Sequence, residues 1–198
     1  GSPRPCLAVI GTAAPTALEQ TCILLDTTGA VKVTVSPDDL ANRLASTAAT
    51  AVSTIADALN QGRDVALTIG PGQADSDRLL SGLTCIVGEA IASSSTQADL
   101  ILTGGATARA VLDRLNITHM QVIAEVHPGA VVAAVTSEAN PAQAADAAAQ
   151  AATASARSQL IATRPGSHGD THSLAAMRAS LTHLRTTRRP HERHHHHA

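Results

Sequence analysis

The amino-acid sequence predicts an α/β domain with a mostly parallel β-sheet and helices on both of its faces. Short apolar runs alternate with segments of helical composition, which is the order that builds a parallel sheet. Glycine-rich turns follow four of the apolar runs, after Ile10, Ile69, Thr103 and Thr163. The chain has 198 residues, of which 44% are hydrophobic, and it is therefore long enough to bury one sizeable core.

Seven short apolar runs are predicted to form the strands. They lie at residues 6–10, 31–35, 64–69, 100–103, 119–126, 130–135 and 159–162. The second run shows the pattern most clearly, because Val31, Val33 and Val35 alternate with polar residues. Three residues, His127, Pro128 and Gly129, separate the fifth run from the sixth, so these two strands are predicted to be a hairpin or sequential neighbours.

Five segments are predicted to be helical. They lie at residues 15–25, 36–60, 76–93, 107–115 and 170–184. Pro15 and Pro37 stand at first helical positions, where the missing N–H is not needed, and Ser36 caps the second helix. A further Ala-rich stretch at 140–157 has high helix propensity but little amphipathic contrast.

The composition excludes several classes of protein. Phe, Tyr and Trp are absent, so no base can stack on an aromatic ring, as single-stranded nucleic-acid binding usually requires. A formal net charge of -2 gives no basic field for nucleic acid or an anionic membrane. The sequence has no transmembrane run and no signal peptide, and Cys6, Cys22 and Cys85 are expected to be reduced thiols, buried or partly buried. A cytoplasmic protein is therefore expected. Lys32 is the only lysine and alanine is abundant, a composition that suggests a bacterial source.

Residues 5–184 are predicted to form one domain, which no internal repeat or linker divides; the motifs described next identify it as a nucleotide-binding domain. Gly1 and Ser2 are typical of a cloning remnant. Residues 185–198 are predicted to be a disordered tail, rich in basic residues and histidine and partly a purification tag. The Ala-rich stretch near residues 144–152 is a candidate aliphatic patch for a homodimer.

Two glycine turns far apart in the sequence have the pattern of a phosphate site. One consists of Gly104, Gly105, Ala106 and Thr107, and the other contains Arg164, Gly166 and Gly169. Glycine lets the backbone come close to an anion, and a helix start offers unpaired N–H groups and a positive dipole end. Because ligands of parallel sheets bind outside the carboxyl ends of the strands, the sequence predicts a nucleotide site at that edge.

Each of these residues also has a plainer interpretation. The sequence has no Walker A and no GxGxxG motif, so the turn at Gly104 is equally an ordinary strand-to-helix connection. Thr107 is either a helix cap or a phosphate ligand. Arg164 either holds a phosphate through two hydrogen bonds or is a solvated loop residue.

Other polar residues near these turns are assigned local roles. Asp170 is expected to cap the last helix. His168 and His172 are interpreted as loop histidines rather than as metal ligands, and no metal-binding residue is predicted. Glu125 either lines the site or is a solvated carboxylate at a strand end. Because no GxSxG motif is present, Ser-His-Asp catalysis is not suggested.

The order of these motifs resembles the C-terminal half of the four-carbon acid sugar kinase family, some members of which were formerly labelled type III effector Hrp-dependent proteins. The family typically opens this half with a strand, a Gly-Ser turn and a Gln several residues on, and Gly11, Thr12 and Gln20 stand in that pattern. The family's next three motifs are a Gly-Gly-acid-Thr turn, a Glu-x-x-Pro-Gly element and a final Thr-Lys-x-Gly-Gly-Phe-Gly-Asp motif. They correspond here to residues 104–107, 125–129 and 163–170.

The resemblance covers almost all of residues 5–184 and implies both a function and a site. In that family this half binds ATP, the other half binds a sugar acid such as erythronate or threonate, and a phosphoryl group passes to a hydroxyl with Mg²⁺ expected. The residues that the resemblance and the turns together assign to ATP or ADP are Thr12, Gly104, Gly105, Ala106, Thr107, Arg164, Gly166 and Gly169. The sugar-acid half is expected to be absent from this chain, so the isolated chain is expected to be inactive.

The chain departs from the family pattern at four positions. The acid of the Gly-Gly turn is Ala106, the lysine of the last motif is Arg164, its second glycine is Ser167 and its aromatic residue is His168. Three interpretations stay open. The chain is the ATP-binding domain of a sugar-acid kinase, a non-catalytic nucleotide or anion-binding module with a degenerate site, or a structural domain that keeps only the fold.

Overall fold

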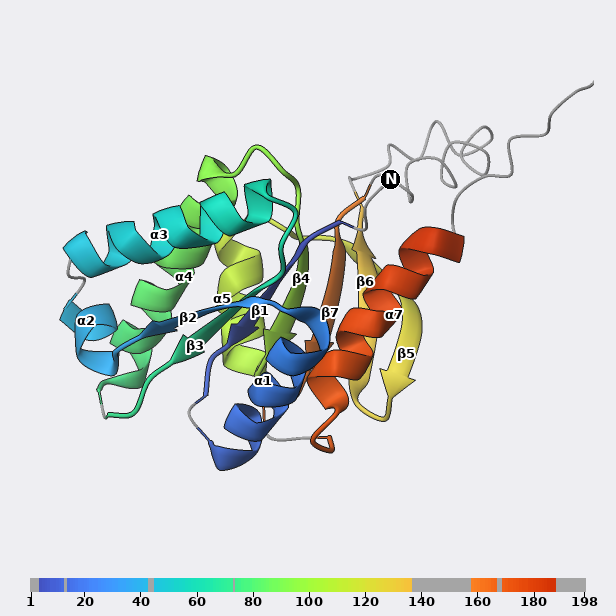
Figure 1. Ribbon diagram of the computed structural model, residues 1–198, viewed down its shortest axis with the longest axis horizontal. Coiled ribbons are helices and arrows are strands. Elements are labelled where there is room, and N and C mark those ends of the chain that lie inside the picture. The colour runs from blue at the N-terminus through green and yellow to red at the C-terminus, as the bar shows by residue number, and fades with distance from the viewer. Residues whose placement is uncertain are drawn as a thin grey trace, which may run out of the picture.

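The computed structural model contains one sheet of seven strands with helices on both faces, as predicted (Figure 1). It describes residues 4–12, 14–42, 45–72, 74–136, 158–166 and 169–187. The strands are β1 (Cys6–Ile10), β2 (Val31–Val35), β3 (Val65–Ile69), β4 (Asp99–Thr103), β5 (Met120–His127), β6 (Ala130–Val135) and β7 (Leu160–Arg164). The helices are α1 (Pro15–Thr28), α2 (Pro37–Asn42), α3 (Ala45–Asn60), α4 (Ser76–Ser93), α5 (Gly105–Arg114) and α7 (Ser173–Thr187).

The strands follow one another across the sheet in the order β2-β3-β1-β4-β7-β6-β5. The first five of these pair in parallel. Strand β6 is antiparallel to β7, and β5 is antiparallel to β6. Of the two arrangements predicted across Pro128 and Gly129, the structure therefore has the hairpin. The carboxyl end of β5 therefore lies at the same edge of the sheet as the carboxyl ends of the parallel strands.

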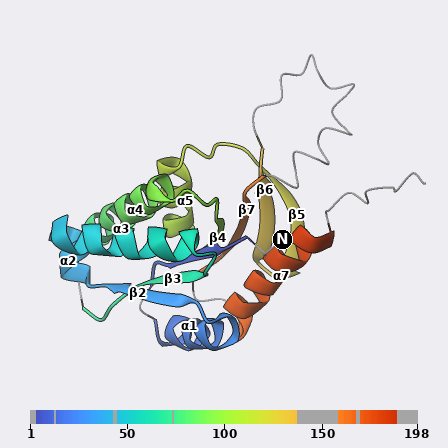
Figure 2. The ribbon, with the colours of Figure 1, turned by 45° about the horizontal axis from the view of Figure 1, so that its top comes forward.

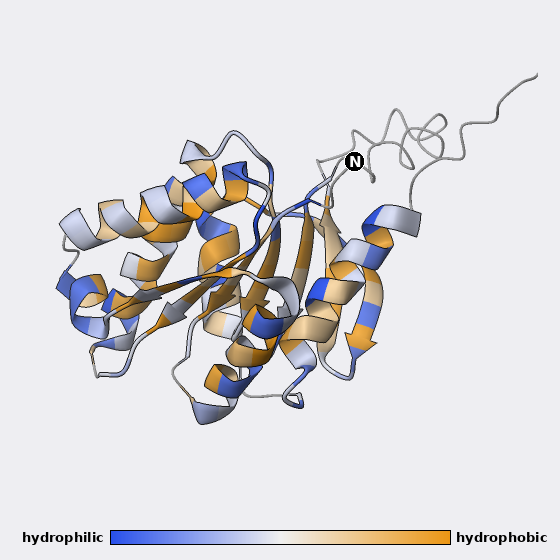
Figure 3. Ribbon diagram, viewed as in Figure 1, coloured by the Kyte–Doolittle hydropathy of each residue, from blue (hydrophilic) through white to orange (hydrophobic). Residues whose placement is uncertain are grey.

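The two faces of the sheet are covered by different sets of helices. Helices α1 and α7 pack on each other over one face, and α2, α3, α4 and α5 cover the other (Figure 2). Successive residues of a strand point to opposite faces, so Leu7 and Val9 belong to the core under α3 and α4, whereas Ala8 and Ile10 belong to the core under α1 and α7. Figure 3 shows the strands as the most hydrophobic part of the ribbon. With no aromatic side chains, both cores consist of small and branched aliphatic residues.

The single helix predicted at residues 36–60 is wrong, because two helices, α2 and α3, occupy this segment. Helix α2 packs Leu40 on α4 at Gly82, where an added Cβ would lie 2.4 Å from the carbonyl oxygen of Leu40. Helix α3 buries Ile55 and Leu59 in the core with β2 and β3. Both helices pack on α4, and α3 also covers β2 and β3.

Several boundaries near the end of the chain differ from the prediction. The last helix begins at Ser173 instead of residue 170 and ends at Thr187 instead of residue 184. The Ala-rich stretch at 140–157, with its candidate dimer patch, lies outside the described residues. So does the tail from residue 188 onward.

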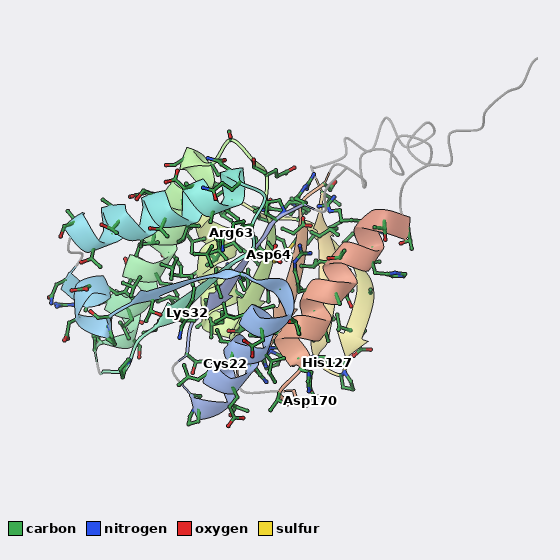
Figure 4. The ribbon with its side chains drawn as sticks, viewed as in Figure 1. Cys22, Lys32, Arg63, Asp64, His127 and Asp170 are labelled. Atoms are coloured by element: carbon green, nitrogen blue, oxygen red, sulfur yellow. The ribbon has the colours of Figure 1, made fainter. Side chains whose placement is uncertain are left out.

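The three cysteines are free thiols in different environments. Cys6 is buried in β1, and its burial raises the pKa of the thiol well above its usual range. Cys85 is half-buried, but Cys22 is exposed, so the expectation of at least partial burial was wrong for Cys22. Helix α1 turns Ala17, Thr21 and Leu24 inward, which leaves Cys22 on its solvent side (Figure 4). Within the described ranges, no helix has both the length and the apolar character that spanning a membrane requires.

Two carboxylates at the amino edge of the sheet hold α7 in place. Asp64 accepts hydrogen bonds from Arg178, with Nε–Oδ2 and Nη2–Oδ1 distances of 2.6 and 3.0 Å. Asp99 is 1% exposed and accepts from the guanidinium of Arg185 and from the backbone N–H of Leu160. Arg178 and Arg185 are about two helical turns apart, so both reach the same side of α7. The last helix is thus fixed to the strands by two Arg–carboxylate pairs.

Replacing Asp99 by alanine is expected to lower the free energy of unfolding by about 3–5 kcal/mol, because Arg185 then keeps a half-buried charge without its carboxylate. Urea denaturation followed by circular dichroism measures the change. Asp113→Ala is the control, because it removes the exposed pair of Arg109 and Asp113 and should leave the midpoint almost unchanged. Equal midpoints for Asp99→Ala and the unmodified chain would contradict this role of Asp99.

Candidate functional site

Three turns at the carboxyl edge of the sheet lie against one another. Gly11 follows β1, and an added Cβ on it would lie 2.0 Å from Oγ1 of Thr107. Gly104 follows β4 and Gly166 follows β7. An added Cβ on Gly166 would lie 3.5 Å from the Cα of Gly104. The backbone N–H of Gly104 donates to the carbonyl oxygen of Arg164 at 3.0 Å. The turns approach so closely that Gly11 has no room for a side chain.

These turns stand where the chain leaves two paired strands toward opposite faces. Strands β1 and β4 pair in parallel over their whole length. The chain leaves β1 for α1 on one face of the sheet and leaves β4 for α5 on the other face (Figure 2). In open α/β sheets this topological switch point is where ligands bind.

Helix α5 begins at the switch point with its first turn uncapped. Gly104 stands at the N-cap with φ +92°, and no side chain caps the helix. Gly105 and Ala106 are exposed, the first turn contains no acid, and a Cβ on Gly105 would meet no atom within 4 Å. The first N–H groups of a helix have no partner within it. This end of α5 therefore offers donors and a positive dipole end to an anion.

Two threonines shape the turns around the start of α5. Thr107, predicted as a cap or a phosphate ligand, is the third residue of α5 and not its cap. It is buried, and its hydroxyl lies against Gly11. The hydroxyl oxygen of Thr12 accepts a hydrogen bond from the backbone N–H of Ala14 at 3.2 Å, which bends the chain into α1.

Arg164 is buried and turned toward α1. It is the last residue of β7, is 2% exposed, and donates from its guanidinium to the side-chain oxygen of Gln20. Burial lowers the pKa of Arg164. The interpretation of Arg164 as a solvated loop residue is therefore wrong. Its hydrogen bond points to α1, not to the contact between Gly104 and Gly166.

Gln20 joins three elements behind the site. It lies in α1 and is 1% exposed. Its amide oxygen accepts from Arg164, and its Nε2 donates to the carbonyl oxygens of Asp170 at 2.7 Å and of Gly169 at 3.4 Å. The side chain thus holds the end of β7 and the turn before α7 at fixed positions relative to α1.

The turn before α7 also contacts the β5–β6 hairpin. Gly169 has φ +91°, and an added Cβ would lie 2.4 Å from the hydroxyl oxygen of Ser173. That hydroxyl is hydrogen-bonded to Nε2 of His127, at the end of β5. Asp170 was expected to cap α7, but its Oδ1 accepts from the N–H of His172 and closes a turn before the helix begins. Figure 4 shows His127 and Asp170 near the start of α7.

The remaining turn at this edge belongs to the β2 side of the sheet. The N–H of Gly70 donates to the carbonyl oxygen of Val35 at 2.9 Å, and Gly72 lies against Pro37. Of the four turns predicted to lie at this edge, those after β1, β4 and β7 make direct contacts, and the turn after β3 contacts β2 and α2 instead. Glu125 is exposed on β5.

The resemblance implies Mg²⁺, and the residues present can be tested against this ion. Magnesium takes oxygen ligands, usually one or two carboxylates together with phosphates and water. Among the described residues, no cluster of three or more His, Cys, Asp and Glu side chains could hold a metal. Residues 11–14, 104–107 and 164–170 contain one acid, Asp170, whose Oδ1 is used within its own turn. These turns do not fit a magnesium site held by the protein.

Sequence reasoning missed the roles of Gln20 and of the pair formed by His127 and Ser173. Gln20 falls on the inward face of α1 with Ala17, Thr21 and Leu24, at helical spacing. A polar residue on such a face needs partners, so this spacing could have marked it as a buried hydrogen-bonding group. No local pattern marks His127 or Ser173, because their contact depends on how the hairpin packs on the last turn.

Comparison with protein families identifies a family for most of the chain. The chain matches the family described as "Nucleotide-binding C-terminal domain" over residues 7–174. No curated protein matches the chain.

Solved structures share the fold at low sequence identity. One is a protein with a domain of unknown function (DUF1537) from Bordetella bronchiseptica, described as a domain-swapped dimer with bound citrate. It has 19% identity over 92% of this chain and 42% of that chain, with a TM-score of 0.69. A Salmonella typhimurium LT2 protein, named as a candidate tRNA synthase, has 13% identity over 91% of this chain and 42% of that chain, with a TM-score of 0.65.

A Haemophilus influenzae DUF1537 protein has 10% identity over 91% of this chain and 41% of that chain, with a TM-score of 0.59. This chain therefore spans about two fifths of the length of these proteins. At these identities the likeness shows the shared fold.

Gly11→Ala is expected to disrupt the contact between the turns, because its Cβ would overlap the hydroxyl of Thr107. We expect a lower thermal midpoint and altered amide resonances at the start of α5. Gly105→Ala is the matched control, because the added Cβ meets no atom within 4 Å and should leave both measurements almost unchanged. If the two variants behaved alike, the close packing of these turns would be wrong.

Gln20→Leu is expected to lower the free energy of unfolding by about 1–3 kcal/mol, because the hydrogen bonds from Arg164 and to two backbone carbonyls are lost in a buried setting. Urea denaturation measures the change. Glu19→Leu, at the exposed neighbouring position of α1, is the control and should have little effect. An equally stable Gln20→Leu chain would show that the amide does not hold these elements together.

Proposed function

Because this chain belongs to the family of nucleotide-binding C-terminal domains, we propose that it binds ATP and ADP at the carboxyl edge of its sheet. The observation that carries the proposed location is the contact of three glycine turns beside the uncapped start of α5. The phosphate groups lie against the N–H groups of Gly105 and Ala106, between the turns that contain Gly11 and Gly166.

The other predicted site residues have supporting roles in this proposal. Thr12 and Thr107 shape the turns on either side of the phosphates. Arg164 and Gly169 support the last turn from behind, through Gln20 and Ser173. Because the chain has no aromatic residue, the adenine base lies between aliphatic side chains.

We further propose that this nucleotide site serves phosphoryl transfer from ATP to a hydroxyl of a four-carbon sugar acid. The order of four motifs supports this reaction, and so does the fold shared with the DUF1537 proteins. Those proteins are more than twice as long, which leaves room for a separate sugar-acid part. Phosphoryl transfer depends on holding both substrates in line. The chain by itself therefore binds nucleotide without catalysing transfer at an appreciable rate.

A non-catalytic nucleotide-binding module is the second candidate function. Ala106 favours it, because it stands where the resembling family has an acid. The inward hydrogen bond of Arg164 to Gln20 favours it as well. Joining this chain to the remaining part of the Bordetella bronchiseptica relative and measuring ADP formation with sugar acids separates the two candidates. Turnover that depends on the sugar acid supports the kinase, and nucleotide binding without turnover supports the module.

We extend the proposal to a homodimer, because the Bordetella bronchiseptica relative is described as a domain-swapped dimer. The edge strand β5 is a candidate contact surface. It carries Met120 and Val122, whose exposed fractions are 37% and 64%. Sedimentation analysis of the unmodified chain and of Val122→Lys tests this surface.

The nucleotide site is tested by titration calorimetry with ATP and ADP, for which saturable binding is expected. Gly105→Asp is expected to abolish binding, because its carboxylate stands in the exposed first turn of α5 and repels the phosphates. Gly105→Asn is the neutral control of the same shape and should bind within about threefold of the unmodified chain. Undiminished binding by Gly105→Asp would mean that the nucleotide binds elsewhere.

A further inference from the structure

We propose that this site binds the phosphates of a nucleotide without a divalent cation, so that free ADP binds at least as tightly as its magnesium complex. The inference rests on the proposed nucleotide site and concerns the form of the ligand that the site takes. It follows from the charges of the residues around the start of α5.

Helix α5 has a positive N-terminal end that no carboxylate balances. Its first turn contains no acid, and its N-cap residue, Gly104, has no side chain. Ala106 is exposed in this turn. A carboxylate at that place would repel a phosphate unless a cation lay between the two groups, whereas a methyl group needs no such bridge. The N–H groups and the helix dipole therefore receive the phosphates directly.

Asp170 is the one acid on the three contacting turns, and its surroundings assign it to a different task. Its Oδ1 accepts from the N–H of His172 at 3.0 Å, and its carbonyl oxygen accepts from Gln20 at 2.7 Å. Both contacts are with α1 or the start of α7. It is Gly166, earlier in the same turn, that contacts Gly104. Asp170 thus closes the turn into α7 and does not complete a cation site.

The other carboxylates near this edge lie outside the three contacting turns. Glu125 is exposed on β5, and Asp77 lies in the first turn of α4. Asp38 and Asp39 lie in the first turn of α2, after β2. Asp75 caps α4, where its Oδ1 accepts from the N–H of Arg78 at 3.0 Å. In the part of the chain that the structure describes, these acids form no metal-binding cluster. Arg164 adds a full positive charge at the end of β7, next to the turn that contains Gly166.

Titration calorimetry with ADP in EDTA and in millimolar Mg²⁺ tests the inference. For the unmodified chain, the dissociation constant in Mg²⁺ is expected to lie within about threefold of that in EDTA, or to be larger because binding is weaker. Ala106→Asp is expected to weaken binding in EDTA by about tenfold or more, and Mg²⁺ is expected to restore much of the loss. Ala106→Asn is the control of the same shape and should show neither the loss nor the dependence on Mg²⁺.

The outcomes separate this inference from the function on which it rests. If Mg²⁺ strengthened binding to the unmodified chain by about tenfold or more, and Asp170→Asn removed that gain, Asp170 would be a cation ligand and the inference would be wrong. If Mg²⁺ strengthened binding and Asp170→Asn kept the gain, a group other than Asp170 would hold the cation, and the inference would again be wrong. If ADP bound in neither buffer, the proposed nucleotide site would be wrong and the inference would fall with it.

Discussion

Strands β1 and β4 pair in parallel along their whole length, and the chain leaves them toward opposite faces of the sheet. This arrangement brings the turn at Gly11 beside the start of α5, so closely that an added Cβ on Gly11 would lie 2.0 Å from the hydroxyl oxygen of Thr107. Strand β7 pairs with β4 on its other side and brings Gly166 against Gly104. The candidate site is therefore a consequence of strand order, because three turns separated in sequence can meet only at this edge.

The positions of these turns depend on contacts behind them. Gln20 ties α1 to the end of β7 and to the turn before α7 by hydrogen bonds in a buried setting. Helix α7 then runs from that turn to the opposite edge of the sheet, where Arg178 and Arg185 pair with Asp64 and Asp99. One helix thus links the glycine turns to a buried ionic network, which keeps the backbone donors of the site in a fixed arrangement.

Much of the fold could be predicted, because each strand is a short apolar run bounded by turns. Strand β2 was predicted to the residue from the alternation of its valines. The division into α2 and α3 was not predicted. Helix α2 packs at Leu40 against Gly82, which is remote in sequence, so no local pattern marks this contact. The site shows the same contrast. Topology alone predicted that Gly104 and Gly166 lie at one edge, but the inward turn of Arg164 depends on Gln20, in a distant helix.

The central claim is that nucleotide phosphates bind between the turns after β1, β4 and β7. Amide resonances of the isotope-labelled chain, recorded during titration with ADP in EDTA, test it most directly. We expect the largest shifts at Gly11, Thr12, Gly166 and residues 104–107, with small shifts on α2 and α3. Shifts that centred on another surface, such as the groove between α1 and α7 that Thr27, Ala175 and Ala179 line, would contradict it.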